Sequence, residues 1–264
     1  MKIQIMTFNI HGLPWVRCPI EKIAAWVGEK QIPILCFQEV FTASGRSKLK
    51  RILERHGYTV VIPRDDDVAP LSSGLLTAVH RDSYSILSDC FISFMHYRNA
   101  EGFANKGFHS LFLRETTTPY RRIYVVNTHT QSDEEILWIT PKSAKDRIRF
   151  HQAEQILGHF EGVKTPVLVV GDFNQESSLH PFLRSLRPSS TMPIRKATFF
   201  RTGEDLDHIA WMPIQWTEAA GAKSGCTFCG AFGPQLVYCK VHEEAMSDHA
   251  AVEMHVELKD GSLK

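Results

Sequence analysis

The sequence contains no long apolar run. Its first residues, MKIQIMTFNIHG, alternate apolar and polar side chains, whereas a signal peptide carries an unbroken apolar stretch of roughly 7–15 residues. No stretch approaches the ~18 consecutive apolar residues that a membrane-spanning helix needs. We therefore expect neither a signal peptide nor a transmembrane segment, which leaves a cytoplasmic location and export by a non-classical route both open.

The sequence also lacks an excess of charge of either sign. It has 30 Lys and Arg against 29 Asp and Glu, a net charge of +1, and no block of basic residues. Proteins that bind nucleic acid through an arm or tail usually carry such a block. Nucleic-acid binding is therefore disfavoured, although a local basic patch is compatible with a neutral total.

Internal repeats, low-complexity tracts and recognisable linkers are absent as well. The 264 residues, of which 43% are hydrophobic and 22% charged, have the composition of an ordinary globular protein. This length is suited to one large domain, and we predict a single domain over residues 1–264. The sequence predicts no particular oligomeric state.

The sequence has six cysteines, and their spacing is informative at only one place. Cys226, Cys229, Cys239 and His242 follow the pattern C-x2-C-x9-C-x2-H, which resembles the ligand spacing of a small zinc site. We favour the alternative of three reduced thiols in an apolar region, and a disulfide would be available if the protein were exported.

Short apolar and alternating segments dominate what is present. They predict strands at 2–10, 32–38, 58–62, 74–80, 84–94, 107–114, 121–129, 167–171, 206–211 and 250–258. Helices are predicted at 20–30, at 44–56, from Thr140-Pro141 through AKDRIRFHQAEQILGHF, with Thr140 as N-cap, and near 179–186. Many strands with few helices favour an α/β protein in which two sheets pack together and the helices lie outside.

Polar side chains recur where these strands begin or end. The set consists of Asn9, Glu39, Asn127, His129, Asp172, Asn174, Asp207, Asp248 and His249. Carboxylate and amide oxygens are the ligands that Mg²⁺ and Mn²⁺ prefer, and too few Cys and His accompany them to indicate catalytic zinc. Histidines beside carboxylates supply acid, base and charge stabilisation. A polar turn is the alternative for any one of these positions, but the whole set predicts metal-assisted hydrolysis of a phosphate ester.

The segment VLVVGDFN illustrates the argument. Asp172 and Asn174 follow a buried strand and are spaced two residues apart. Side chains at this spacing point to the same face as long as the chain stays extended. The spacing therefore indicates that both side chains line one site, with a polar turn after the strand as the alternative.

Seven segments occur in an order that resembles the endonuclease/exonuclease/phosphatase superfamily, which has the DNase I-like fold. They are TFNIHG, QEV, SSGLL, NTHTQ, GDFN, LDHIAW and SDHAAV. The resemblance extends from about residue 3 to residue 256. It implies a single catalytic domain built as a four-layer α/β/β/α sandwich, with two mostly antiparallel sheets and the active site at one end of them.

The resemblance also implies metal ligands and a phosphate site. Glu39 resembles the principal ligand of a Mg²⁺ ion, for which Mn²⁺ is an alternative, and Asn9 and Asp248 complete the ligand set. Asn174 matches the residue that contacts the phosphate, and His129 matches the one that stabilises the pentavalent phosphate or the leaving group.

The remaining motif residues imply the activation of water. Asp172 matches the residue that orients or deprotonates the attacking water, and Asp207 resembles the carboxylate that orients His249. Whether Asp172 or His249 is the general base stays open. The complete set argues against a binding module that kept the fold without catalysis.

Three segments indicate a branch of the superfamily. QEVF, ANKGF and THTQSD resemble bacterial neutral sphingomyelinases, and the Asn105-Lys106-Gly segment also resembles inositol-polyphosphate phosphatases. Asn105 and Lys106 are thus predicted to bind phosphate. The leading prediction is a sphingomyelinase-like phospholipase C that acts on a lipid headgroup and contacts a membrane surface transiently. A DNA or RNA nuclease and an inositol-phosphate phosphatase are the alternatives.

Other side chains receive structural interpretations. Arg149 and Gln152 resemble an R-x-x-Q pair that ties the long helix to the sheet. We expect His11, His151 and His159 to be surface or packing histidines. The late aromatic residues are interpreted either as core or as lipid-contacting groups; they are Trp211, Trp216, Phe228, Phe232 and Tyr238.

Overall fold

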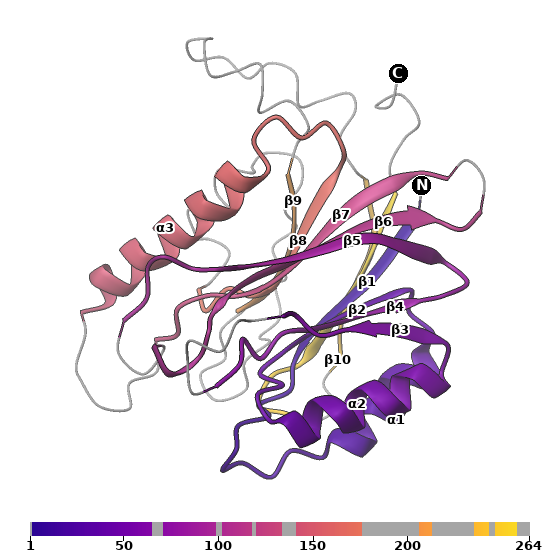
Figure 1. Cartoon of the computed structure of the whole chain (residues 1–264), viewed down its shortest axis with the longest axis horizontal. Coiled ribbons are helices and arrows are strands. Elements are labelled where there is room, and N and C mark those ends of the chain that lie inside the picture. The colour runs from indigo at the N-terminus through magenta and orange to yellow at the C-terminus, as the bar shows by residue number, and fades with distance from the viewer. Residues whose placement is uncertain are drawn as a thin grey trace.

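The computed structural model describes residues 2–64, 71–98, 102–117, 120–133, 141–175, 206–212, 235–242 and 246–257. These residues form two β-sheets flanked by helices (Figure 1). The first sheet contains β1 (Lys2–Asn9), β2 (Ile34–Gln38), β3 (Tyr58–Val61), β4 (Leu76–His80), β10 (Gln235–His242) and β11 (Ala251–Glu257), in the order β10-β11-β1-β2-β4-β3. The second contains β5 (Tyr84–Ser93), β6 (Gly107–Glu115), β7 (Arg122–His129), β8 (Val167–Asp172) and β9 (Asp207–Met212), in numerical order.

Three apolar cores hold four layers together. Between the sheets, side chains such as Ile5, Leu111 and Val170 pack against one another. Helices α1 (Ile20–Lys30) and α2 (Ala43–Arg55) cover the outer face of the first sheet, and α3 (Lys142–His159) covers the second (Figure 1). The predicted α/β/β/α sandwich is therefore confirmed. None of the helices in the described ranges is long and apolar enough to cross a membrane.

Most predicted elements lie within two residues of the observed ones, and two differ. Strand β10 falls in a segment for which the sequence predicted no element. The N-cap position of α3 is Pro141, without a side-chain capping bond, so the prediction of Thr140 as N-cap was wrong. The predicted helix near 179–186 lies outside the described residues, and the single-domain assignment stays a prediction.

Along the face of β1 that points toward the second sheet, the side chains change from apolar to polar. Ile3 and Ile5 belong to the inter-sheet core, whereas Thr7 and Asn9, on the same face, are buried and polar. The same change recurs along three more strands; the residues are Ile34, Cys36 and Gln38 on β2, Ile123, Val125, Asn127 and His129 on β7, and Leu168, Val170 and Asp172 on β8. Because β1 is parallel to β2 and β7 is parallel to β8, these polar residues gather at one end of the inter-sheet layer, which we call the polar end.

A buried amide pair joins the two sheets beneath the polar end. Gln38 Nε2 donates to Asn127 Oδ1 at 2.7 Å and to Thr7 Oγ1 at 3.0 Å. Asn127 Nδ2 lies within hydrogen-bonding distance of two carbonyl oxygens of the first sheet, at 3.1 Å each, and of Thr77 Oγ1 at 3.3 Å. Buried amides are costly unless they are satisfied, so this pair favours one placement of the strand ends on either side.

Candidate active site

Six polar side chains from both sheets meet at the polar end. Asn9, Glu39, His129 and Asp172 lie at or just beyond the carboxyl ends of β1, β2, β7 and β8. Asp207 begins β9 and His249 precedes β11; both strands run antiparallel to their neighbours, so their first residues reach the same end. The predicted convergence of strand ends is thus found for these six residues.

Asn9 links the two carboxylates at the centre. Its Nδ2 donates to Glu39 Oε1 at 3.0 Å and to Asp172 Oδ2 at 2.9 Å, while its Oδ1 accepts the backbone N–H of His11. The amide nitrogen therefore faces the carboxylates and holds them together. The role of Asn9 as an oxygen ligand of a metal stays a prediction.

Asp172 and Asn174 are brought together by a turn, and the prediction from an extended chain was wrong. Asn174 has a φ of 49°, in the left-handed region that asparagine tolerates. Its N–H donates to Asp172 Oδ1 at 2.8 Å, and its side-chain Nδ2 donates to Thr130 O at 3.0 Å. The strand ends at Asp172, and the Asp172 carboxylate itself stabilises the turn that places Asn174.

A line of three charged side chains crosses the site. His249 Nδ1 lies 2.8 Å from Asp207 Oδ2, and His249 Nε2 lies 3.7 Å from Asp172 Oδ2. Burial alone would lower the pKa of His249, but the charges of Asp207 and Asp172 raise it to about 10. Burial likewise opposes ionisation of Asp172, yet the charge of His249 and the hydrogen bonds from Asn9 and from the N–H of Asn174 keep its pKa below the ordinary value. Near neutral pH the proton therefore resides on His249, and Asp172 is a carboxylate.

His129 and Lys106 form the opposite side of the site. Lys106 Nζ lies 3.2 Å from His129 Nε2 and donates to Thr130 O at 2.8 Å. Burial, followed by the neighbouring ammonium, lowers the pKa of His129 to about 3, so the imidazole is neutral. A neutral imidazole beside an ammonium is a suitable receptor for an anionic oxygen. Asn105 is directed elsewhere, because its Oδ1 accepts a hydrogen bond from Ser93 at 2.7 Å.

Glu39 has the features of a metal ligand. Its Oε2 is buried and has no hydrogen-bond partner among the residues that the structure describes, and burial raises the pKa of the carboxyl. Its φ of 58° is uncommon for a residue other than glycine, and a Cβ on Gly12 would lie 2.5 Å from its carbonyl oxygen. A carboxylate oxygen of Glu39, a carboxylate oxygen of Asp172 and a ring nitrogen of His129 all lie within 4.8 Å of one another. A buried carboxylate oxygen that receives no hydrogen bond is a suitable ligand for a divalent cation.

Two contributors were missed by the sequence interpretation. His11 lies in the site, with Nδ1 3.1 Å from Asp248 Oδ2 and 3.8 Å from Glu39 Oε2, so its assignment as a surface or packing residue was wrong. Ser247 donates to the carbonyl oxygen of Asn9 at 2.8 Å and accepts the N–H of His249 at 3.2 Å. The adjacency of Ser247 to Asp248-His249 was the available signal.

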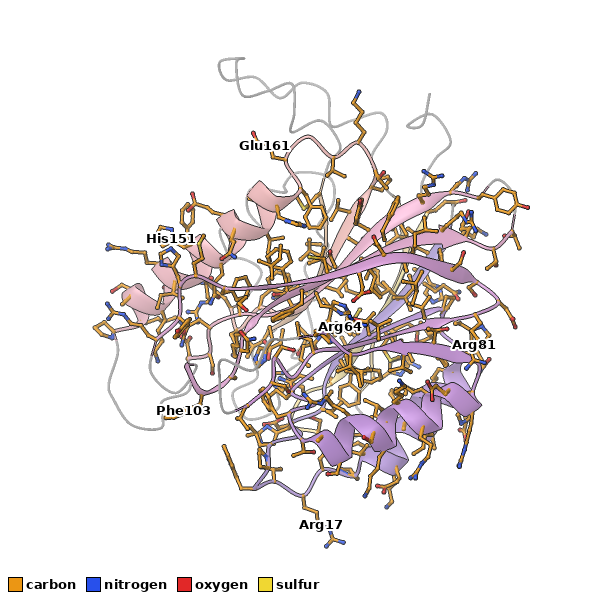
Figure 2. The ribbon with its side chains drawn as sticks, in the orientation of Figure 1. Arg17, Arg64, Arg81, Phe103, His151 and Glu161 are labelled. Carbon is orange, nitrogen blue, oxygen red and sulfur yellow. The ribbon has the colours of Figure 1, made fainter. Side chains whose placement is uncertain are left out.

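The structural predictions for the long helix are confirmed. Arg149 Nη1 donates to Gln131 O at 2.9 Å, and Gln152 accepts the N–H of Gln131. His151 is half-buried on α3 (Figure 2), with its ring against His96, and the ring of His159 packs against Phe108.

The zinc hypothesis remains without a test. His242 Nε2 lies 2.8 Å from Glu253 Oε2. Cys226, Cys229, Trp216, Phe228 and Phe232, and the side chains of Trp211, Tyr238 and Cys239, lie outside the described residues.

Replacing Asp207 with Asn tests the line of charges. Without the carboxylate, the pKa of His249 should fall from about 10 toward its ordinary value of 6.5, and kcat should fall about 10-fold or more. Because the folded-state pKa is raised, the pair stabilises the fold fully below about pH 6.5 and loses that contribution as pH rises to about 10. NMR titration of the His249 ring and urea unfolding at several pH values measure both effects. An unchanged pKa of His249 in Asp207→Asn would refute the assignment.

Comparisons with known proteins agree with this geometry. A sequence profile described as "Endonuclease/Exonuclease/phosphatase family" matches residues 6–249. No curated protein sequence matches the chain. Among solved structures, sphingomyelinase C from Streptomyces griseocarneus has a TM-score of 0.69 at 17% identity and covers 97% of this chain and 99% of its own.

Two other solved structures are similar over their whole length. Beta toxin from Staphylococcus aureus, a double mutant with bound magnesium ions, has a TM-score of 0.66 at 17% identity, with 98% of this chain and 100% of that chain covered. D. rerio TDP2 in complex with single-strand DNA product has a TM-score of 0.68 at 12% identity, with 97% and 99% covered. At these identities the three structures establish the fold.

Proposed function

The chain belongs to the endonuclease/exonuclease/phosphatase family and is a metal-dependent phosphoric diester hydrolase, and on that premise we propose that it is a sphingomyelinase-like phospholipase C. The observation that carries the hydrolytic part is the line Asp207–His249–Asp172, which faces Glu39 and His129 across the polar end. Together these residues place carboxylates, a charged imidazole (His249) and a neutral imidazole (His129) around one space.

In this proposal each residue of the site has a separate role in the hydrolysis of a phosphodiester. Asp172, ionised at neutral pH, orients the attacking water and accepts its proton. His249 keeps its proton through Asp207 and stabilises negative charge on the phosphate. His129, supported by Lys106, contacts the leaving-group side. A divalent ion bound at Glu39 would supply Lewis-acid neutralisation of the phosphate charge.

Three features support a lipid substrate over nucleic acid. Lys106 comes from the ANKGF segment, and Gln131, from THTQSD, is tied to α3 through Gln152. The net charge of +1 provides little electrostatic attraction for a polyanion such as DNA or RNA. Trp15 and Phe103 are 68% and 52% exposed, four residues after His11 and three before Lys106, and Figure 2 places Phe103 at the margin of the molecule. These exposed aromatic side chains suit transient contact with a membrane surface.

A single substrate panel tests the proposal. Purified protein with Mg²⁺ or Mn²⁺ is assayed against sphingomyelin, lysophospholipids, plasmid DNA, RNA and an inositol phosphate, with Asp172→Asn as the inactive control. We expect release of phosphocholine from sphingomyelin at a rate far above that of DNA nicking. Efficient nicking of plasmid DNA with sphingomyelin and lysophospholipids left intact would establish the nuclease alternative instead.

A further inference from the structure

Four of the seven large apolar side chains that are exposed in the described ranges come from one region of the fold. This region consists of the connection between β5 and β6 and the first half of α3. The four residues, which we call the apolar patch, are Met95, Tyr97, Phe103 and Phe150, and Met95 is 75% exposed. A group of protruding apolar side chains indicates contact with a protein or with a membrane.

Contacts with α3 join the Met95 and Phe150 sides of the patch. Gln155 of α3 accepts the backbone N–H of Met95 on its Oε1 at 3.0 Å. The ring centroid of His96 lies 4.8 Å from that of His151, which lies 5.8 Å from that of Phe150. The helix therefore fixes the backbone of the connection and leaves the apolar side chains directed to solvent.

The Tyr97 ring extends the patch toward Phe103. A Cβ on Gly102 would lie 3.2 Å from Tyr97 Cε2, so this ring lies against the backbone that immediately precedes Phe103. Figure 2 shows Phe103 and His151 at the same margin of the molecule, on the left of the view. The four side chains therefore belong to one surface.

The apolar patch adjoins the active site. Lys106, whose Nζ lies 3.2 Å from His129 Nε2, follows Phe103 by three residues in the same connection. In addition, the N–H of Arg98 donates to Gln131 Oε1 at 3.0 Å, and Gln131 follows His129 by two residues. A surface in contact with the patch would therefore lie close to the residues proposed to act on the phosphodiester.

Two guanidinium groups accompany the patch without acidic partners. Arg98 is exposed in the β5–β6 connection, and Arg147 is exposed three residues before Phe150 on α3. Neither forms an ion pair with any residue that the structure describes, whereas Glu154 on the same helix is paired with His151 at 3.0 Å. Arginine next to exposed apolar side chains is suited to the interface of a bilayer, where lipid phosphates lie above the acyl chains.

We propose that the apolar patch docks the protein on a lipid bilayer, with its four side chains in the interfacial layer and with Arg98 and Arg147 at the lipid phosphates. The inference rests on the proposed function and deepens it, because it names the surface through which the site reaches a lipid substrate. The positive charge favours an anionic surface over an apolar protein partner. The position beside the active site favours a surface that contains the substrate.

Vesicle binding in excess EDTA, which prevents turnover, tests the proposal. Wild-type protein is mixed with vesicles of phosphatidylcholine and phosphatidylglycerol, and the bound fraction is measured by flotation. Replacing both Met95 and Phe150 with Ser should weaken binding by about 10-fold or more, in line with the loss of two large apolar contacts. Arg98→Gln combined with Arg147→Gln should remove most of the additional binding that phosphatidylglycerol produces.

Tyr120 provides a matched control for Tyr97. Both are tyrosines with 55% exposure, and Tyr120 precedes β7, at the opposite end of that strand from His129. Tyr97→Asn should weaken vesicle binding, whereas Tyr120→Asn should leave it unchanged. Asn is chosen because it tolerates the left-handed backbone of Tyr120, and circular dichroism checks that each variant is folded.

The outcomes separate this inference from the proposed function. Equal vesicle binding by wild type and by the Met95→Ser, Phe150→Ser double variant would overturn the docking surface, as would a wild-type protein that binds no vesicles. Self-association that the double variant abolishes, without vesicle binding, would assign the patch to a second copy of the chain and also overturn it. Vesicle binding that needs the patch, with no hydrolysis of sphingomyelin or lysophospholipids, would support the docking surface and contradict the proposed function alone.

Discussion

Replacing Asp172 with Asn is expected to lower kcat by roughly 10³-fold while leaving the fold intact, in line with the loss of a general base. The substitution preserves shape but removes the negative charge. That charge lies 3.7 Å from His249 Nε2 and 3.6 Å from His129 Nε2, and it accepts a hydrogen bond from Asn9. The measurement is the initial hydrolysis rate on the best substrate of the panel, with circular dichroism to confirm folding.

The control for this prediction is Asp82→Asn, which makes the same chemical change at an exposed turn position. It should retain full activity. If Asp172→Asn were to keep more than a tenth of wild-type kcat, Asp172 could not be the group that accepts the proton of water. His249 would then be the remaining candidate, with the proton passing to its ring instead.

Glu39→Gln is expected to lower activity to near background, and excess EDTA should do the same to the wild-type protein. Glu39 provides a buried oxygen, Oε2, that has no hydrogen-bond partner among the described residues, so a negative charge there attracts a cation. Gln has nearly the same shape and no charge. The expected result is loss of divalent-ion binding by calorimetry together with loss of turnover.

Stability provides an independent readout for Glu39→Gln. Burial raises the pKa of the Glu39 carboxyl, so its ionised form is disfavoured in the metal-free protein. We expect the metal-free variant to unfold at the same temperature as wild type or higher, whereas wild type alone should gain stability from added metal. Glu161→Gln, beyond the C-terminal end of α3 in Figure 2, is the matched control. Full turnover in excess EDTA would contradict the prediction.

The residues whose place in the fold the sequence predicted share a local signal. Asn9, His129 and Asp172 each continue the alternation of a strand whose earlier members are apolar, so both their face and their end of the sheet follow from the pattern. Arg149 and Gln152 follow from the period of the helix and the family resemblance. In such cases local pattern and tertiary position agree, and the position can be predicted from the sequence.

The features that the sequence missed depend on contacts made after folding. The backbone at His11 and at Asn174 is left-handed because side chains of Asn9 and Asp172 accept the N–H groups of these two residues. No periodic pattern encodes such a turn. Strand β10 was missed for a related reason: among the described strands it pairs with β11 alone, and a long segment rich in Gly and aromatic residues precedes it in the sequence.

The central position of β1 in its sheet bears on the synthesis of the protein. β1 is the first of the described strands in the chain, yet one of its two neighbours is β11, the last of them, and Ser247 reaches back to the carbonyl oxygen of Asn9. A nascent chain therefore carries an open strand edge and an incomplete site until residues near 257 have been translated. Assembly of the site therefore depends on the synthesis of β11 and Ser247, which lie about 240 residues after Asn9 in the chain.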